Sequence, residues 1–173
     1  MTDTRRYVIR RAFVAPLGLA LILMGALLVV SIVHGQPVAK LAFLIIFAIP
    51  VTIMFVVSAF RSLRIDPAGV TSTSPFRTRH MEFSQVTALE TVRVRSRVFL
   101  TLEAGADEFL IISNGYADFA GLVNTLVAAV PPEAVTEETR QLAANPPVRH
   151  ADVALAWFTV AALVYVLLAQ FKG

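Results

Sequence analysis

Three long, uncharged, apolar runs constrain this chain more than any other feature. They cover Ala12 to Val33, Leu41 to Phe60 and Val153 to Phe171. At a rise of 1.5 Å per residue, each run predicts a helix close to the roughly 30 Å thickness of a bilayer's hydrocarbon core. The segment between the first two runs contains His34-Gly35-Gln36-Pro37, which predicts a turn and hence a helical hairpin. The sequence therefore predicts a membrane protein with three transmembrane helices.

The composition agrees with a membrane class. Apolar residues make up 57% of the chain and the mean hydropathy is +0.71, whereas ordinary soluble domains hold about 45 to 50% apolar residues. The chain has no cysteine, which excludes disulfides, thiol catalysis and cysteine-based zinc sites. Outside the apolar runs there is room for one small domain, and the stretch from Arg61 to Val130 is the only part long and polar enough to form it.

The basic residues near the helix ends predict the orientation. Those that flank the first two runs on one side are Arg5, Arg6, Arg10, Arg11, Arg61 and Arg64. Lys40 alone lies beside the connecting turn. The positive-inside rule therefore places both ends of the hairpin in the cytoplasm. We expect an inner (cytoplasmic) membrane protein with its N-terminus and central domain in the cytoplasm and its C-terminus outside.

A secretory signal is the alternative interpretation of the N-terminus. The segment from Thr4 to Arg10 resembles a loose twin-arginine motif. The apolar run that follows it is longer than the roughly 7 to 15 residues of a signal core, and no Ala-x-Ala cleavage pattern follows the run. We therefore favour a plain membrane anchor.

From Leu63 onward, short strand-like segments replace the apolar runs. Leu63 to Asp66 and Val70 to Ser74 flank the turn Pro67-Ala68-Gly69, which predicts a β-hairpin whose glycine is available for a positive φ. Further strand-like segments lie at Thr78 to Phe83, Val86 to Arg95, Val98 to Leu102 and Phe109 to Ile112. This spacing predicts a small antiparallel barrel or sandwich.

The end of the predicted domain shows helical periodicity. A helix is expected from Tyr116 to Val130, capped by Ser113 or Asn114, and it would cover one face or opening of the β-structure. Pro131 and Pro132 end this helix, and a polar, Pro-rich linker is expected after them. The predicted fold is an α+β membrane protein with an N-terminal tail and helical hairpin over 1–60, the cytoplasmic domain over 61–130, the linker over 131–150 and the third transmembrane helix over 151–173.

Two runs within this domain are similar to a known family. They are Ile65-Asp66-Pro67-Ala68-Gly69-Val70 and Arg79-His80-Met81-Glu82-Phe83-Ser84-Gln85-Val86, and further strands and a closing helix follow them. The stretch from Leu63 to Val130 thus resembles the bacterial pleckstrin-homology-like domains of small multi-pass membrane proteins. In that family, Trp is frequent at the position of Phe83 and Asp at that of Gln85.

The resemblance implies a bent, partly open antiparallel barrel capped by a C-terminal helix. It also implies a binding module rather than an enzyme. Eukaryotic relatives that hold phosphoinositides use Lys and Arg around the first hairpin turn. Here that turn is Asp66-Pro67-Ala68-Gly69 with only Arg64 nearby, so specific inositol-phosphate binding is not expected.

Alternating arginines are the candidate binding residues. Arg93, Arg95 and Arg97 would project from one face of a single strand while Val92 and Val94 face the core. The same spacing recurs at Arg77 and Arg79. Such a face suits anionic lipid headgroups or an acidic protein partner. The alternative is an ordinary solvated face on which glutamates neutralise the arginines.

The sequence shows no pattern that would support a reaction. His80 stands apart from the other two histidines, no His-acid pair accompanies the serines and threonines, and no Gly-rich phosphate loop occurs. We expect no enzyme activity, metal, cofactor, small-molecule substrate or nucleic acid. The expected function is a membrane-anchored accessory or scaffolding subunit that contacts membrane lipids and a membrane protein complex. The alternative is a sensor of anionic lipid headgroups that uses the arginine face.

Overall fold

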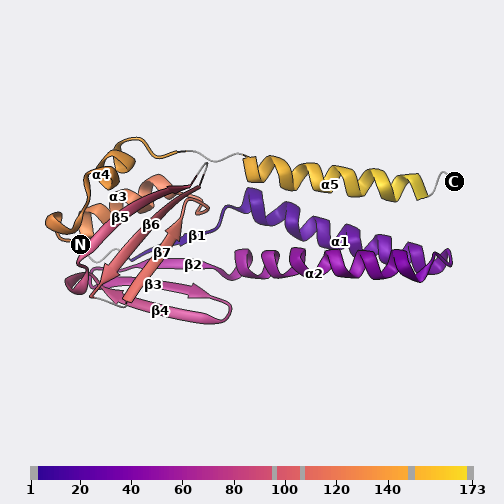
Figure 1. Cartoon of the computed structure of the whole chain (residues 1–173), viewed down its shortest axis with the longest axis horizontal. Coiled ribbons are helices and arrows are strands. Elements are labelled where there is room, and N and C mark those ends of the chain that lie inside the picture. Colours follow the sequence, from indigo (N-terminus) through magenta and orange to yellow (C-terminus); the bar gives the residue numbers. More distant parts are fainter. Residues whose placement is uncertain (1–3, 95–96, 106–107, 148–150, 171–173) are drawn as a thin grey trace. The chain divides into compact units, whose positions relative to one another are not determined.

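The computed structural model describes residues 4–94, 97–105, 108–147 and 151–170. These residues form two compact units, which are described separately (Figure 1). The first, called the β domain below, combines the N-terminal segment up to Arg10 with the stretch from Phe60 to Arg149. The second, called the helical unit, combines Arg11–Ala59 with the residues from His150 onward. Each unit is therefore built from two separate parts of the chain.

The helical unit contains the three predicted helices. They are α1 (Arg11–Val33), α2 (Val38–Phe60) and α5 (Ala151–Gln170), and each is long and apolar enough to cross a membrane. The chain is thus a membrane protein by the length and composition of these helices. Pro50 lies inside α2. Because proline has no backbone N–H, the carbonyl of Ile46, four residues earlier, lacks its usual helical partner. The hydroxyl of Thr52 donates to a different carbonyl, that of Ala48, at 2.8 Å.

The packing within the helical unit is uneven. α1 and α5 contact each other, and they bury side chains such as Leu27 and Val160. No residue of α2 is buried among the described residues. The Phe55 ring of α2 packs against Gly18, and a groove of about 500 Å³ between α1 and α2 is lined by apolar side chains and Gly25. Most of the α2 surface is consequently apolar and exposed, as expected for a helix surrounded by lipid.

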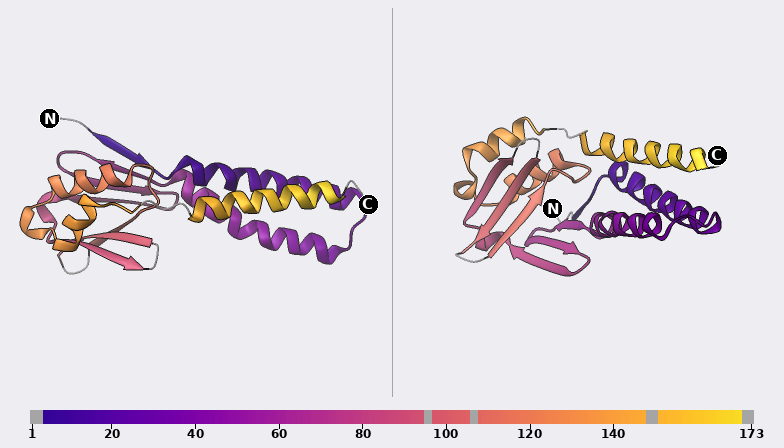
Figure 2. Two further views of the ribbon diagram at one scale, coloured as in Figure 1. Left: turned by 90° about the horizontal axis from the view of Figure 1, so that it is seen from above. Right: turned by 45° about the vertical axis from the view of Figure 1, so that its right-hand side comes forward.

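Seven strands form two antiparallel sheets in the β domain. The first sheet has the order β1 (Arg5–Val8), β2 (Ser62–Ile65), β3 (Gly69–Ser74) and β4 (Arg77–Glu82). The second has the order β5 (Ala88–Val94), β6 (Arg97–Ala104) and β7 (Glu108–Ser113). A short 3₁₀ turn, Phe83–Gln85, connects them. Figure 2 gives two further views of these strands.

The hairpin between β2 and β3 depends on Asp66 and Gly69. The Asp66 carboxylate accepts hydrogen bonds from the backbone N–H groups of Ala68 and Gly69 at 3.0 and 2.9 Å, which fixes the turn. The positive φ expected at Gly69 is wrong, because among the described glycines only Gly35 and Gly105 have one. Glycine is needed at position 69 because a Cβ atom would collide with the backbone carbonyl of Met81 on β4.

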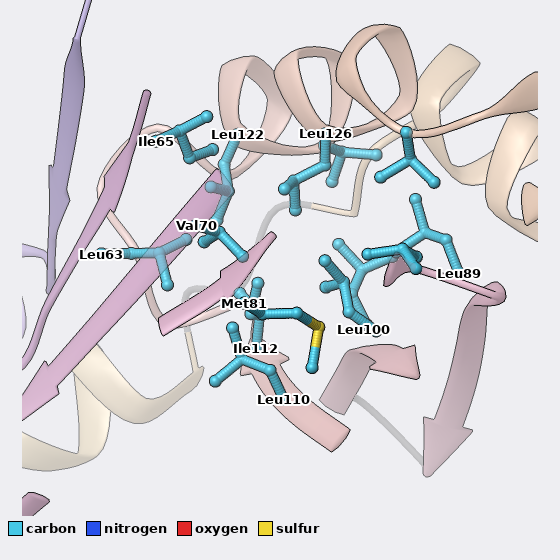
Figure 3. Close-up of a cluster of buried hydrophobic side chains, with 14 of the residues drawn as sticks. Leu63, Ile65, Val70, Met81, Leu89, Leu100, Leu110, Ile112, Leu122 and Leu126 are labelled. Carbon is cyan, nitrogen blue, oxygen red and sulfur yellow. The ribbon is translucent and has the colours of Figure 1, made fainter. Parts of the chain in front are cut away.

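One apolar cluster joins the two sheets to the helix α3 (Phe119–Ala129). Figure 3 shows side chains of both sheets, including Leu63, Met81, Leu100 and Ile112, gathered in one cluster with Leu122 and Leu126 of α3. These side chains alternate along their strands with exposed ones, as a sheet with one buried face requires. Asp118 caps the start of α3, because its carboxylate accepts a hydrogen bond from the backbone N–H of Gly121 at 2.9 Å. The expected cap at Ser113 or Asn114 and the expected start at Tyr116 are therefore wrong.

Two parts of the β domain were not assigned to it from the sequence. The tail before α1 contains β1, which pairs with β2 and buries Tyr7. The expected linker contains a 3₁₀ turn (Pro132–Ala134) and the helix α4 (Glu137–Ala144), which packs against β5. Leu142 and Thr139 of α4 are fully buried. The segment up to Ala144 is thus part of the domain, and Arg149 and His150 lie outside the described residues.

Candidate functional site

The inner face of the first sheet changes from apolar to polar along its strands. The register brings side chains of β2, β3 and β4 into rows that cross the sheet. From one end to the other, the rows are Ile65–Val70–Met81, then Leu63–Ser72–Arg79, then Ser74–Arg77. The first row belongs to the buried apolar cluster, and the last row is entirely polar. The core of the domain therefore gives way to a polar surface at the end of the sheet where β2 begins.

Arg61 belongs to this polar end. It directly precedes Ser62, which pairs with Thr73, so strand alternation places Arg61 on the same face as Leu63 and level with Ser74. Together with part of β7, five polar side chains line a hollow of about 210 Å³. We call these five residues, Arg61, Ser72, Ser74, Arg77 and Arg79, the arginine groove.

The free edge of β7 forms the opposite wall of the arginine groove. Arg79 Nη1 donates to the carbonyl oxygen of Phe109 at 2.7 Å, and Arg61 Nη2 donates to that of Ile111 at 3.3 Å. The Arg79 guanidinium also lies 5.6 Å from the centre of the Phe109 ring, within the range of a cation–π contact. Because these two carbonyls point away from β6, the N–H groups of the same residues also face the groove. Along this edge, β7 is therefore bonded by guanidinium groups of the first sheet instead of by the backbone of a further strand.

The charge of the groove is predominantly positive. Three arginines line it, and an adjoining hollow of about 400 Å³ adds one carboxylate, that of Glu108. Arg77 is exposed, and no hydrogen bond or ion pair holds its guanidinium among the described residues. Arg61 and Arg79 are fixed by their carbonyl partners, whereas Arg77 is available to a ligand.

A buried tyrosine lies behind Arg61. The Tyr116 hydroxyl is fully buried and close to the Arg61 guanidinium, although no well-formed hydrogen bond joins them. Burial raises the pKa of Tyr116 above its usual value near 10, and the positive charge of Arg61 offsets part of this rise. Tyr116 also pairs through its backbone with Ile9, at the end of β1. The tyrosine, itself a member of the apolar cluster, therefore remains neutral at physiological pH.

The structure brings together only two of the five arginines predicted as a binding face. Arg77 and Arg79 lie in the arginine groove. The single strand expected for Arg93, Arg95 and Arg97 is wrong. β5 ends at Val94, one residue after Arg93, and Arg97 begins β6. Arg93 is paired with the buried Val98 and Arg97 with the exposed Val94, so the two arginines project from opposite faces. Arg95 lies outside the described residues.

The expected burial of two valines is also wrong. Val92 and Val94 are 46% and 53% exposed. They lie on the outer face of β5, opposite to the face on which Leu89 belongs to the apolar cluster. On the face toward the core, Thr91 instead binds the Thr139 hydroxyl of α4 at 2.8 Å. Alternation identified the two faces of β5 but did not indicate which of them α4 covers.

Arg61 was missed as a site residue. It follows the second apolar run directly, so it was interpreted as part of the charge pattern that orients the membrane helices. The alternation of Arg61, Leu63 and Ile65 was the available signal, because it puts the arginine on the face that becomes buried further along the strand. The contribution of β7 carried no sequence signal, since backbone carbonyls occur at every residue.

Comparison of the chain with models of known protein families, with curated proteins and with solved structures found no match. The residues themselves indicate what the groove can bind. Guanidinium groups, serine hydroxyls and backbone N–H groups are all donors to anionic oxygen. Among the described residues, no group of three or more His, Asp or Glu side chains could hold a metal ion. The arrangement suits a carboxylate or phosphate group.

Proposed function

We propose that this chain is a non-enzymatic, membrane-anchored binding module that serves as an accessory or scaffolding subunit of a membrane protein complex. The arginine groove is the observation that carries the proposal. Two of its guanidinium groups are held in place by the carbonyls of Phe109 and Ile111, so they need little ordering when a ligand binds. The ligand is an acidic side chain or terminal carboxylate of the partner protein.

The chemistry of the groove favours an anionic group. A guanidinium carries five N–H donors, and the bonds to Ile111 and Phe109 use one donor each on Arg61 and Arg79. The remaining donors, the free guanidinium of Arg77 and the hydroxyls of Ser72 and Ser74 face the same hollow. A carboxylate that enters it exchanges water for charge-assisted hydrogen bonds, which are stronger than neutral ones.

The proposed location is the inner membrane, with the β domain in the cytoplasm and the C-terminus outside. The positive-inside rule supports this orientation through the arginines around β1 and β2. Chain connectivity gives independent support for the hairpin, because α1 starts three residues after Val8 and α2 ends two residues before Ser62, and these two residues are paired. Both ends of the hairpin therefore emerge on the side of the membrane where the first sheet lies.

A pleckstrin-homology-like fold is part of the proposal. Two antiparallel sheets that share one apolar cluster with the helix α3 support it. The chain would differ from a simple example of that fold in two respects. A membrane hairpin separates β1 from β2, and α4 follows the closing helix α3.

The alternative function is a sensor of anionic lipid headgroups. Its expected surface was the row Arg93, Arg95 and Arg97, and that geometric basis is lost for Arg93 and Arg97, which project from opposite faces. We therefore place the protein partner first.

The proposal is tested by purification of the full chain from its native membrane in a mild detergent. The tagged wild type is expected to retain a defined partner, and Arg77→Glu is expected to lose it, because a carboxylate in the groove repels the acidic ligand. Arg64→Glu is the matched control, since Arg64 lies on the outer face of the same sheet and is exposed. Recovery of the wild type alone, or equal retention of the partner by Arg77→Glu, would overturn the proposal.

A further inference from the structure

The turn between β3 and β4 exposes an aromatic side chain. Phe76 is 87% exposed, more than any other large apolar residue of the described chain. It lies in the two-residue turn between Ser74 and Arg77, a position that polar residues usually occupy. A single exposed apolar residue needs no explanation by itself. The location of Phe76 in the sheet and the charged residues near it indicate a more specific role.

The register shows which end of the sheet carries this turn. Val8, Ser62, Thr73 and Thr78 form one row across β1 to β4. Ser62 follows the last residue of α2 by two positions, so the row lies at the end of the sheet that is tethered to the membrane helices. β3 and β4 are one and two strand spacings from β2, and each spacing is about 4.8 Å. The turn therefore lies within about 10 Å, across the sheet, of the point where the chain leaves α2.

The acidic residues in the described part of the first sheet lie away from its tethered end. Arg61 and Arg77 lie at the tethered end, whereas Asp66 and Glu82, together with Arg5, lie at the other end, beside the β2–β3 turn. Among the described residues, Glu108 of β7 is the acidic side chain that shares the adjoining hollow with Arg77 and Arg79. An apolar tip that directly precedes Arg77, on the end of the sheet that also carries Arg61, complements an anionic lipid surface, which attracts nearby basic residues.

We propose that the β3–β4 turn docks onto the anionic headgroup layer of the membrane in which this chain is anchored. The Phe76 ring enters the interfacial layer, and the positive charges of Arg61 and Arg77 attract the anionic headgroups to this end of the sheet. The contact relies on the membrane location given above but not on a protein partner. It holds the first sheet at the membrane surface and leaves the rest of the arginine groove accessible to a partner.

Site-directed spin labelling tests the contact, and the absence of native cysteine makes each single label unambiguous. The full chain is reconstituted into nanodiscs that contain phosphatidylglycerol or only phosphatidylcholine. Nitroxides are attached at Phe76→Cys, at Ala68→Cys in the turn at the opposite end of the sheet, and at Phe158→Cys on the exposed face of α5. Collisions with oxygen and with a water-soluble nickel chelate are then compared.

We expect the label at position 76 to lose collisions with nickel relative to position 68 in the anionic nanodiscs. This loss is expected to be smaller in phosphatidylcholine or at high salt, because salt screens the contribution of Arg77. A second label at Thr78→Cys keeps Phe76, and adding Phe76→Asp should restore nickel access there.

Equal nickel access at positions 76 and 68 in the anionic nanodiscs would overturn the proposal, provided that the label at 158 reports an inserted helix. If position 158 were itself open to nickel, the membrane location would be wrong and the proposal would fall with it. Loss of a co-purified partner upon Phe76→Asp would show that the turn binds protein rather than lipid. Retention of the partner supports the assignment to lipid.

Discussion

The guanidinium of Arg79 on β4 donates a 2.7 Å hydrogen bond to the carbonyl oxygen of Phe109 on β7. This bond links the last strand of one sheet to the free edge of the other. Arg61 makes a second such bond to Ile111, two residues further along β7. Arg61 and Arg79 therefore both make the groove positive and join the two sheets. Effects on binding and on stability can be separated by comparing them with Arg77, which makes no such bond among the described residues.

Replacing Arg79 should weaken this link. Arg79→Ala is expected to lower the free energy of unfolding of the β domain by about 1 to 2 kcal/mol, because it removes a charge-assisted bond to a carbonyl. The amides of β7 should then exchange faster. Hydrogen exchange of the full chain in detergent, followed by mass spectrometry, measures both effects.

Arg77→Ala is the matched control for that experiment. Arg77 lies two residues away on the same strand face but has no bonding partner among the described residues, so its loss should change stability by no more than about 0.5 kcal/mol. Equal destabilisation by the two variants would show that the carbonyl bond of Arg79 does not hold the sheets together.

Leu142→Ala tests whether α4 belongs to the β domain. Leu142 is fully buried in the apolar cluster, so we expect a loss of about 2 to 5 kcal/mol. Gln141→Ala, at the exposed neighbouring position, is the control. Urea unfolding of the full chain, monitored by limited proteolysis at the β domain, gives the difference. An effect of Leu142→Ala as small as that of Gln141→Ala would restore the linker interpretation of residues 131–150.

Tyr116 should make the β domain sensitive to alkaline pH. Its pKa is raised in the folded state by burial, so the folded protein favours the neutral phenol. The contribution of the neutral phenol to stability is fully present below the pKa of Tyr116 in the unfolded state, which is near 10. It is lost as the pH rises from there through the higher pKa of the folded state. Tyr116→Phe removes a hydroxyl without a well-formed partner and should flatten this decline.

Unfolding curves between pH 8 and 11 compare the two proteins. Near pH 8 the variant should differ from the wild type by less than about 1 kcal/mol, since no good hydrogen bond is lost. A steep alkaline loss that persists in Tyr116→Phe would assign the effect to another group.

The pair Arg6 and Arg64 should cost stability. The two residues lie directly opposite each other on β1 and β2, and both are exposed. Like charges in such a pair are unfavourable by about 0.2 to 1 kcal/mol. Arg64→Glu should therefore stabilise the β domain at low salt, and Arg64→Gln should do so by less. Urea titrations at two salt concentrations test the pair, and a gain that does not depend on salt would contradict an electrostatic origin.

The sequence was informative wherever the signal was local. The three apolar runs correspond to α1, α2 and α5, and the alternating segments after Leu63 correspond to six strands. β1 was missed because its four residues have a partner strand more than 50 positions later, beyond the hairpin. Arg5 and Arg6 in this strand also carry the charge signal used for orientation, which concealed their second role.

The candidate site was harder to predict because it depends on contacts between distant elements. Alternation correctly paired Arg77 with Arg79, but it could not show that β7 would meet them or that Arg61 would join them. The expected row at Arg93 to Arg97 was wrong because one strand was assumed, whereas β5 ends at Val94 and β6 begins at Arg97. α4 was taken for a linker because its short, charged sequence has a strongly polar average, although Leu142 and Thr139 are buried.

Photo-crosslinking in the native membrane tests the central claim most directly. A photoreactive residue is placed at Ser74, in the middle of the arginine groove, and at Arg64 on the outer face of the same sheet as the control. The account predicts a defined protein adduct from position 74 that is absent from position 64 and is lost when Arg77→Glu is added. The absence of a protein adduct at position 74, or equal adducts from both positions, would contradict a partner-binding role for the groove.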